Sequence, residues 1–176
     1  MHTSPEVVTV GHGTLDASDF AELAHRAGIE LIVDIRSYPG SRHVPQFGRE
    51  ALSAWLPDAG IAYRWEPELG GRRKPVPKSK HVALTHQSFR AYADYMETPS
   101  FRTALVRVLD DAARASTAVM CSESVWWRCH RRLIADRLEL IDHVAVVHLF
   151  HDGRTQPHPP MPAARIDGDH LVYDIV

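Results

Sequence analysis

The segment from 121 to 132 holds the densest group of side chains that could carry out chemistry. It reads Cys-Ser-Glu-Ser-Val-Trp-Trp-Arg-Cys-His-Arg-Arg and runs from the end of one apolar segment into a helical pattern. A thiol near a helix start can be partly ionised, because the first backbone N–H groups and the helix dipole favour negative charge. We therefore expect Cys121 or Cys129 to act as a nucleophile, with Glu123 and His130 moving protons.

Two alternatives for this segment stay open. A cysteine at a strand end is more often a small buried hydrophobic residue than a nucleophile. The thiols and His130 could instead supply soft metal ligands, with His12 or Glu123 as a fourth. However, the spacing of Cys121, Cys129 and His130 matches no common zinc pattern, so the sequence assigns no metal ligand and leaves any cofactor open.

Asp34 and Arg36 form a second candidate pair. Asp34 closes an apolar segment, where burying an unpaired carboxylate would be costly. Arg36 lies two residues later, on the same face of an extended chain. The pair is either a structural salt bridge or a carboxylate that orients an arginine for gripping a phosphate or carboxylate. A buried Asp34 could also serve as a general acid or base.

A basic stretch follows Gly70 and Gly71 and could close over a polyanion. It contains five positive charges and no acid within nine residues, namely Arg72, Arg73, Lys74, Lys78 and Lys80. A charge run is more often a solvated loop. Ser41 lies in a Pro-Gly-Ser-Arg-His loop that could grip an anion but is not a P-loop.

These observations define the candidate site. The predicted catalytic residues are His12, Asp34, Cys121, Glu123, Cys129 and His130. The predicted substrate-binding residues are Arg36, Ser41, Gly70, Gly71, Arg72 and Arg131.

Apolar strands alternating with amphipathic helices must position these residues. Strand character is found at 7–10, 31–35, 61–65, 118–121 and 144–150. Helical patterns start at 16 and 99, surround 52–56 and 89–96, and occupy about 127–140. On the last helix we expect His130 to point inward, Arg131 to lie on the flank and Arg132 to point away. The tail contains a proline-rich loop at 153–170 and a predicted edge strand at 171–176.

This alternation predicts a single α/β domain over residues 1–176. We expect three layers, with a mostly parallel, Rossmann-like sheet of about five or six strands flanked by helices. Ligands of such sheets bind beyond the carboxyl ends of the strands. Because His12, Asp34 and Cys121 all stand at strand ends, we expect one shared site at that rim.

The overall composition excludes several functional classes. The chain has 176 residues, 44% hydrophobic and 24% charged, with a formal net charge of −2, so it is not a polycation that coats nucleic acid. Two cysteines are too few for a disulfide framework. The sequence starts with no secretory pattern and has no apolar stretch of membrane-spanning length, which predicts a cytoplasmic protein with no membrane partner. The oligomeric state is open.

Taken in order, these motifs resemble the domain of unknown function 488 family, over roughly residues 8–150. The matching elements are Thr9-Val-Gly-His12, Asp34-Ile-Arg36 with Pro39, Ser41 and Phe47, Gly60-Ile-Ala-Tyr63, Leu69-Gly-Gly71, Phe89, Tyr92 and Met96, Cys121-x-Glu123, and Cys129-His-Arg131. Gly13 departs from the family pattern, which usually has serine there. The resemblance implies an α/β fold and a site built from these motifs, but it supplies no reaction.

Three functional hypotheses remain. The leading one is an enzyme that acts on a phosphate-bearing substrate, either a nucleotide or a nucleic acid. In that hypothesis Arg36, Arg131 and the loop 72–80 hold the anion, and His12 and His130 carry protons. The second is a thiol- or metal-centred protein, and the third is a ligand-binding module without catalysis.

Overall fold

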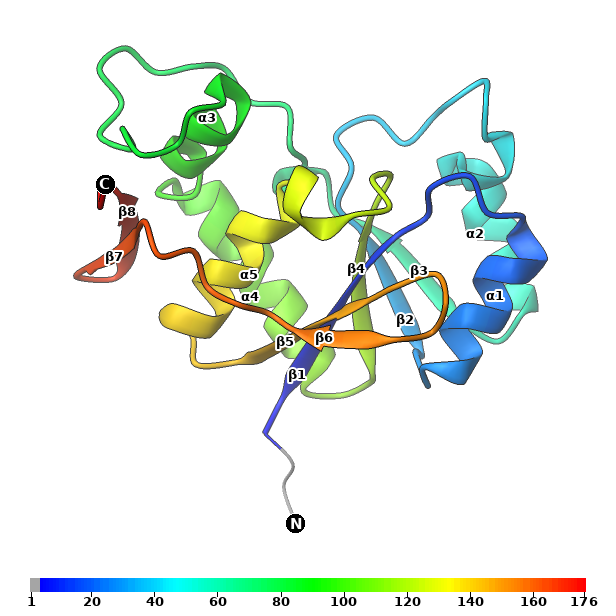
Figure 1. Ribbon diagram of the computed structural model, residues 1–176. Helices are drawn as coiled ribbons and strands as arrows, with labels where there is room; N and C mark the ends of the chain where they lie inside the picture. The colour runs from blue at the N-terminus through cyan, green and yellow to red at the C-terminus, as the bar shows by residue number, and fades with distance from the viewer. Residues whose placement is uncertain (1–3) are drawn as a thin grey trace.

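The computed structural model describes residues 4–176, and within them six strands form a central sheet in the order β3-β2-β4-β1-β5-β6 (Figure 1). The first five are parallel and β6 is antiparallel to β5. The strands are β1 (Glu6–Gly11), β2 (Leu31–Asp34), β3 (Ala62–Trp65), β4 (Thr117–Cys121), β5 (Ala145–Leu149) and β6 (Thr155–Pro157). The predicted mostly parallel sheet is confirmed.

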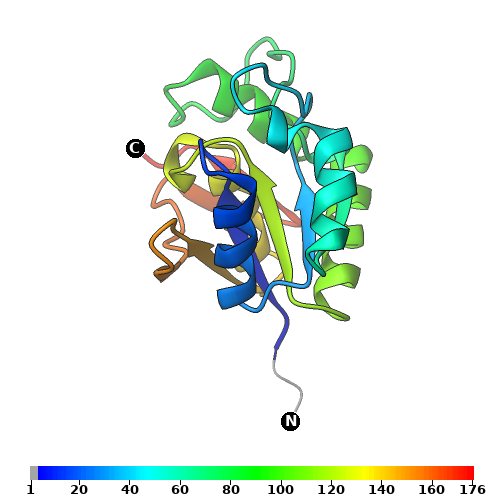
Figure 2. The same ribbon diagram turned by 90° about the vertical axis from the view of Figure 1, so that its right-hand side faces the viewer.

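Helices cover both faces of this sheet and produce the predicted three-layer α/β fold (Figures 1 and 2). The helices are α1 (Ala17–Arg26), α2 (Arg49–Asp58), α3 (Gln87–Tyr95), α4 (Pro99–Ala112) and α5 (Arg131–Leu140). The pair α1 and α2 packs on one face, and α3, α4 and α5 pack on the other. Among the helices of residues 4–176, none combines the length and apolar character needed to cross a membrane.

Apolar patterning explains why these elements form. Every residue of β4 is buried, as expected for a central parallel strand that is covered on both faces. Phe20 and Leu23 bury the inner face of α1, at the spacing that the sequence predicts. Thr98 caps α4 by accepting a hydrogen bond from the Phe101 amide. Asp16 occupies the cap position of α1, but its side chain makes no capping hydrogen bond.

The register of the sheet brings three strand ends to one level. Gly11 of β1 is paired with Cys121 of β4, and Asp34 of β2 is paired with Met120 of β4. The order differs from the Rossmann order 3-2-1-4-5-6, because β4 lies between β2 and β1. The thiol of Cys121 therefore emerges between the strands that carry Asp34 and His12.

The carboxyl-terminal tail differs from the prediction. The antiparallel edge strand of the main sheet is β6, inside the segment expected to be a loop. The predicted edge strand contains β8 (His170–Tyr173), which pairs with β7 (Ala164–Asp167) in a separate two-stranded sheet. Gly168 has a φ of +64° and forms a tight turn with Asp169, so the tail folds back on itself locally.

The predicted helix at 127–140 is shorter in the structure. It starts at Arg131, and Trp126–Arg128 forms a single 3₁₀ turn before it. Cys129 is extended, with φ −127° and ψ 153°. This break at Cys129 shifts the faces of the helix relative to the prediction, with a consequence for Arg131 described below.

Candidate functional site

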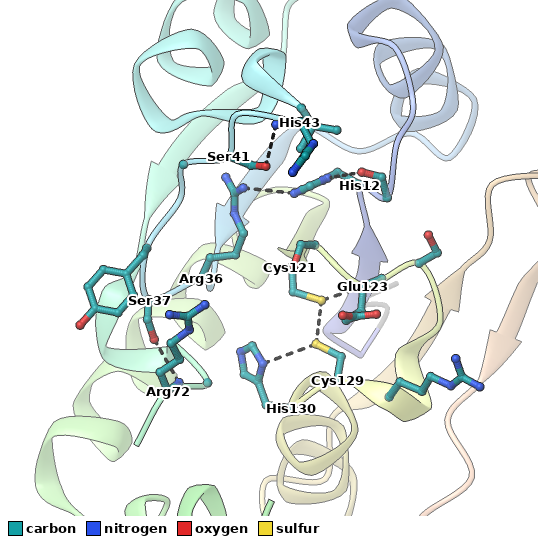
Figure 3. Close-up of a pocket in the computed structure, with 18 of the residues that line it drawn as sticks. His12, Arg36, Ser37, Ser41, His43, Arg72, Cys121, Glu123, Cys129 and His130 are labelled. Atoms are coloured by element: carbon teal, nitrogen blue, oxygen red, sulfur yellow. Dashed lines mark hydrogen bonds between the residues drawn. The ribbon is translucent and has the colours of Figure 1, made fainter. Parts of the chain in front are cut away.

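A pocket of about 570 Å³ opens at the carboxyl ends of β1, β2 and β4 (Figure 3). This is the rim at which the sequence predicts a site. Its lining residues are His12, Gly13, Thr14, Arg36, Ser37, Tyr38, Gly40, Ser41, His43, Val44, Gly71, Arg72, Ser88, Phe89, Cys121, Ser122, Glu123, Ser124, Arg128, Cys129 and His130. Nine of the twelve predicted site residues belong to this set, and Asp34, Gly70 and Arg131 do not.

Two thiols and one imidazole lie side by side in the pocket (Figure 3). The sulfur atoms of Cys121 and Cys129 are 2.7 Å apart, and Nδ1 of His130 lies 3.4 Å from the Cys129 sulfur. The other ring nitrogen of His130 donates to the carbonyl oxygen of Ile35 at 3.0 Å. This carbonyl fixes the ring so that Nδ1 faces Cys129, and a thiol beside an oriented imidazole is able to act as a nucleophile with a base.

The two thiols of the pair differ in how readily they ionise. Burial opposes ionisation, but the hydrogen bond from Cys121 and the neighbouring His130 and Arg131 lower the pKa of Cys129 well below its usual value. Burial, together with the same hydrogen bond, raises the pKa of Cys121. The backbone N–H of Arg131 also points at the Cys129 sulfur, at 3.5 Å. These surroundings favour Cys129 as the more readily ionised thiol and Cys121 as the one that keeps its proton.

Asp34 holds Arg36 in place. The carboxylate is fully buried and accepts from Nε and Nη2 of Arg36 at 2.8 and 2.7 Å and from the Tyr63 hydroxyl at 2.7 Å. Arg36 also donates to the Phe47 carbonyl and to Nε2 of His12. Because Asp34 does not line the pocket, the structure favours its predicted orienting role over a role as acid or base.

His12 is engaged at both ring nitrogens. Nδ1 donates to the Gly13 carbonyl at 2.8 Å, and Nε2 accepts from Arg36 at 3.1 Å. Burial lowers the pKa of His12 to about 4, with Arg36 acting in the same direction and the bond to Gly13 opposing it. The ring also stacks on Phe47, with centroids 4.3 Å apart. With both ring nitrogens engaged, His12 holds Arg36 in place, and its proton-carrying role stays a prediction.

The two glycines serve close packing. A Cβ on Gly71 would lie 2.7 Å from Nδ1 of His130, and a Cβ on Gly70 would lie 2.7 Å from the Cα of Ser37. Glycine is needed where two segments approach this closely. The backbone N–H of Arg72 donates to the Ser37 hydroxyl at 3.2 Å, so this turn holds the Arg72 side chain at the pocket rim.

The rest of the basic stretch does not line the pocket. The guanidinium of Arg73 lies 3.6 Å above the ring of Tyr95 and donates to the carbonyl of Gly70. Lys80 pairs with Glu97 at 2.7 Å. The structure thus brings Arg72 to the candidate site but does not show the predicted cover over a polyanion.

Arg131 lies beneath the pocket, where its side chain is almost completely buried. Its guanidinium donates to the Glu123 carbonyl and to the Thr9 hydroxyl. The predicted flank position was wrong, because the helix starts only at Arg131, after the extended Cys129. Arg131 therefore braces the loop after β4 from below instead of contacting a ligand in the pocket.

Other polar residues complete the lining. Glu123 and Ser41 are exposed and line the pocket, and the Ser41 hydroxyl accepts from the backbone N–H of His43. The sequence analysis missed Arg128, His43 and Ser37 as lining residues. Arg128 directly precedes Cys129 in the sequence, and this adjacency is the one local signal that could have identified Arg128 as a lining residue.

Gly13 has a φ of +53°, in the left-handed region that favours glycine. The space that a side chain would fill at this position is occupied by Ser124 and His151. The departure from the family pattern is thus accompanied by a different hydroxyl, that of Ser124, in the pocket lining.

The alternative of a metal site finds no support in the part of the chain that the structure describes. Among residues 4–176, no group of three or more His, Cys, Asp and Glu side chains converges in a way that could hold a metal ion. Nε2 of His130 is bonded to a backbone carbonyl, so Nδ1, which faces Cys129, is the one ring nitrogen not held by the backbone.

Comparison with known proteins agrees with the motifs. The family model described as Domain of unknown function DUF488 matches residues 16–138, which is more than half of the chain. This range includes the strand end with Asp34 and Arg36 and the segment from Cys121 to His130. No curated protein and no solved structure matches the chain. By this match, the chain belongs to the DUF488 family.

Proposed function

We propose that this protein is a cysteine-dependent enzyme that acts on a phosphate-bearing substrate of nucleotide size. The observation that carries the proposal is the contact between Cys129 and His130, with His130 oriented by the Ile35 carbonyl, at the base of an open pocket. A nucleophile, a base and an orienting acceptor meet there within hydrogen-bonding reach, as covalent catalysis requires.

The charges around the pocket favour an anionic substrate. Three arginines line it, Arg36, Arg72 and Arg128, and Glu123 is the one carboxylate among its lining residues. A guanidinium presents paired donors that match phosphate geometry. The volume of about 570 Å³ suits a ligand the size of a nucleotide. Because the basic stretch after Arg72 does not line the pocket, the charge distribution supports a nucleotide better than a long nucleic acid.

The proposed reaction has two steps. The Cys129 sulfur attacks phosphorus, the bond from phosphorus to the leaving oxygen breaks, and that oxygen takes the proton held by His130. Water then attacks the thiophosphate, Glu123 accepts a proton from this water, and the bond between phosphorus and sulfur breaks to restore the thiolate. Exchange with solvent removes the proton from Glu123 and returns one to His130. Arg36 stabilises the charge on the phosphoryl oxygens through the one Nη1 hydrogen that Asp34, Phe47 and His12 leave free. We also propose a cytoplasmic location, since a reducing compartment keeps both thiols free.

The test compares hydrolysis of nucleotides and p-nitrophenyl phosphate by the wild type, Cys129→Ser and Glu123→Gln. Cys129→Ser should lose turnover by about 10³-fold or more, as expected when a nucleophile is removed. Glu123→Gln should lose about 10²-fold, the usual contribution of a general base. The matched control is Glu50→Gln on the exposed side of α2, which should keep wild-type turnover.

A thermal-shift measurement separates binding from catalysis. Inorganic phosphate and nucleotides should raise the melting temperature of both the wild type and Cys129→Ser, because the serine variant keeps the three arginines. If phosphate compounds stabilise the protein but neither the wild type nor any variant turns them over, the pocket is a binding module. If no phosphate compound stabilises the protein and none is turned over, the proposal is refuted.

A further inference from the structure

The thiol pair has a feature that phosphoryl transfer does not use. One thiolate is enough for the proposed nucleophile, yet Cys121 lies 2.7 Å from it, sulfur to sulfur, and lines the same pocket. A disulfide bond is about 2.05 Å long, so the two sulfurs need little movement to reach bonding distance. Both cysteines are free thiols in the structure.

We propose that Cys129 and Cys121 form a peroxide-reactive site, in which Cys129 is oxidised first and Cys121 resolves it as an intramolecular disulfide. The inference shares Cys129 with the proposed function but does not need a phosphate substrate. Its oxidant is hydrogen peroxide, and a small dithiol such as dithiothreitol is sufficient for the reverse reaction.

The positions of the groups assign a different role to each thiol. Cys129 contacts His130 and the first amide of α5, two groups that stabilise a thiolate. Cys121 stands at the buried end of β4, and the only hydrogen-bonding partners of its thiol among the described residues are the Cys129 sulfur and the Glu123 carbonyl. An ionised, pocket-lining cysteine beside a second thiol is the arrangement typical of redox-sensitive sites.

The chemistry balances over two steps. The Cys129 thiolate attacks one oxygen of hydrogen peroxide, a sulfur–oxygen bond forms, the oxygen–oxygen bond breaks, and the departing hydroxide is protonated to water through His130. The Cys121 sulfur then attacks the Cys129 sulfur, the sulfur–oxygen bond breaks, and the hydroxide leaves as water with the Cys121 proton. In total, two thiols and one peroxide give one disulfide and two waters.

Because the two thiols line the candidate site, their oxidation would change the chemistry of that site. A disulfide removes the Cys129 thiolate, and with it the nucleophile of the proposed function. Oxidation should therefore switch off turnover reversibly, and Cys121 should protect Cys129 from irreversible oxidation to sulfinic acid.

The experiment treats reduced, desalted protein with hydrogen peroxide and without any phosphate compound. Free thiols are titrated, intact mass is measured, and dimedone is used to trap sulfenic acid. The wild type should lose both thiols and the mass of two hydrogen atoms, give no dimedone adduct at completion, and recover both thiols with dithiothreitol. Cys121→Ser should instead accumulate a dimedone adduct on Cys129. Cys129→Ser should consume peroxide about tenfold more slowly or worse, because the remaining thiol is not ionised.

Circular dichroism of each variant confirms that it is folded before oxidation is measured. The proposal is wrong if the wild type gives sulfinic acid, a dimedone adduct or a disulfide-linked dimer in place of the internal disulfide. It is also wrong if Cys129→Ser reacts as fast as the wild type. Failure of phosphate-ester turnover leaves these outcomes unaffected, so the two proposals can be rejected separately.

Discussion

At the scale of single residues, the site depends on one buried ion pair. Asp34 is completely buried, and its two carboxylate oxygens accept from Nε and Nη2 of Arg36. The Tyr63 hydroxyl donates to the same carboxylate. The indole N–H of Trp65 donates to the Arg36 carbonyl and fixes the backbone as well. A guanidinium held this way pays little ordering cost on binding an anion, which is why the pair matters to the pocket although Asp34 does not line it.

Asp34→Ala should lower the free energy of unfolding by about 3–5 kcal/mol, because it leaves the Arg36 guanidinium buried without its partner. Urea denaturation measures this loss. The matched control is Asp152→Ala, which removes the exposed ion pair with Arg154 and should leave the denaturation midpoint almost unchanged. Equal midpoints for the two variants would show that the buried pair contributes nothing to stability.

At the scale of elements, a chain of hydrogen bonds connects the underside of the pocket to the carboxyl-terminal tail. Arg131 of α5 donates to Thr9 of β1, whose hydroxyl lies 2.6 Å from Nδ1 of His148 on β5. Nε2 of His148 is 2.9 Å from His158, and His158 is 2.7 Å from the buried carboxylate of Asp136.

These bonds are all satisfied with one assignment of protons. If His158 donates to Asp136 from Nε2, its Nδ1 accepts from His148, and Nδ1 of His148 accepts from the Thr9 hydroxyl, which in turn accepts from Arg131. Two imidazole rings thus connect a buried cation to a buried anion, and the hydrogen bonds limit the cost of burying both charges.

Asp136→Ala should therefore destabilise the fold by about 3 kcal/mol or more, because three buried donors lose their acceptor. They are the His158 ring, the Met161 amide and the Tyr173 hydroxyl. Tyr173→Phe is the graded control, since it removes one donor and should cost about 1 kcal/mol. Denaturation compares the two variants, and hydrogen exchange should show faster opening at 158–161 in the first. A loss for Asp136→Ala no larger than that for Tyr173→Phe would contradict this description of the network.

At the scale of the whole molecule, buried histidines make stability depend on pH. Burial, together with His158 and Arg131, lowers the pKa of His148 to about 3, and burial with Arg36 lowers that of His12 to about 4. Burial also lowers the pKa of His81, against the opposing effect of Asp94 and Glu97. In the unfolded chain these groups have pKa values of about 6.5, so between about 4 and 6.5 the unfolded state binds more protons.

The free energy of unfolding should consequently be highest above pH 6.5 and fall as the pH is lowered toward 4. Each such histidine contributes a slope of about 1.4 kcal/mol per pH unit in that window. Urea denaturation between pH 5 and 6.5 isolates this effect from that of Glu66, whose lowered pKa acts below its ordinary value of 4.5. His148→Asn should reduce the slope of the unfolding free energy against pH by the contribution of one histidine. An unchanged slope would show that the folded protein does not hold His148 buried in its neutral form.

The sequence by itself determined the architecture and the position of the site. Strand and helix periodicities depend on neighbours within a few residues, so they predict the parallel sheet and identify the strand ends at His12, Asp34 and Cys121. The adjacency of Cys129 and His130 in the chain is also enough to bring a thiol beside an imidazole. Local spacing likewise identified Asp34 and Arg36 as a pair.

Only the tertiary structure decided what each of these residues does. The order of the strands places β4 between β1 and β2, and this depends on pairing between segments that are far apart in the chain. The contact of His130 with the Ile35 carbonyl spans 95 residues, and that of Arg131 with Thr9 spans 122. The extended backbone at Cys129, which delays the start of α5 to Arg131, turned the Arg131 side chain inward. Such contacts arise from packing, which no local periodicity records, so the sequence found the site but not the role of each side chain.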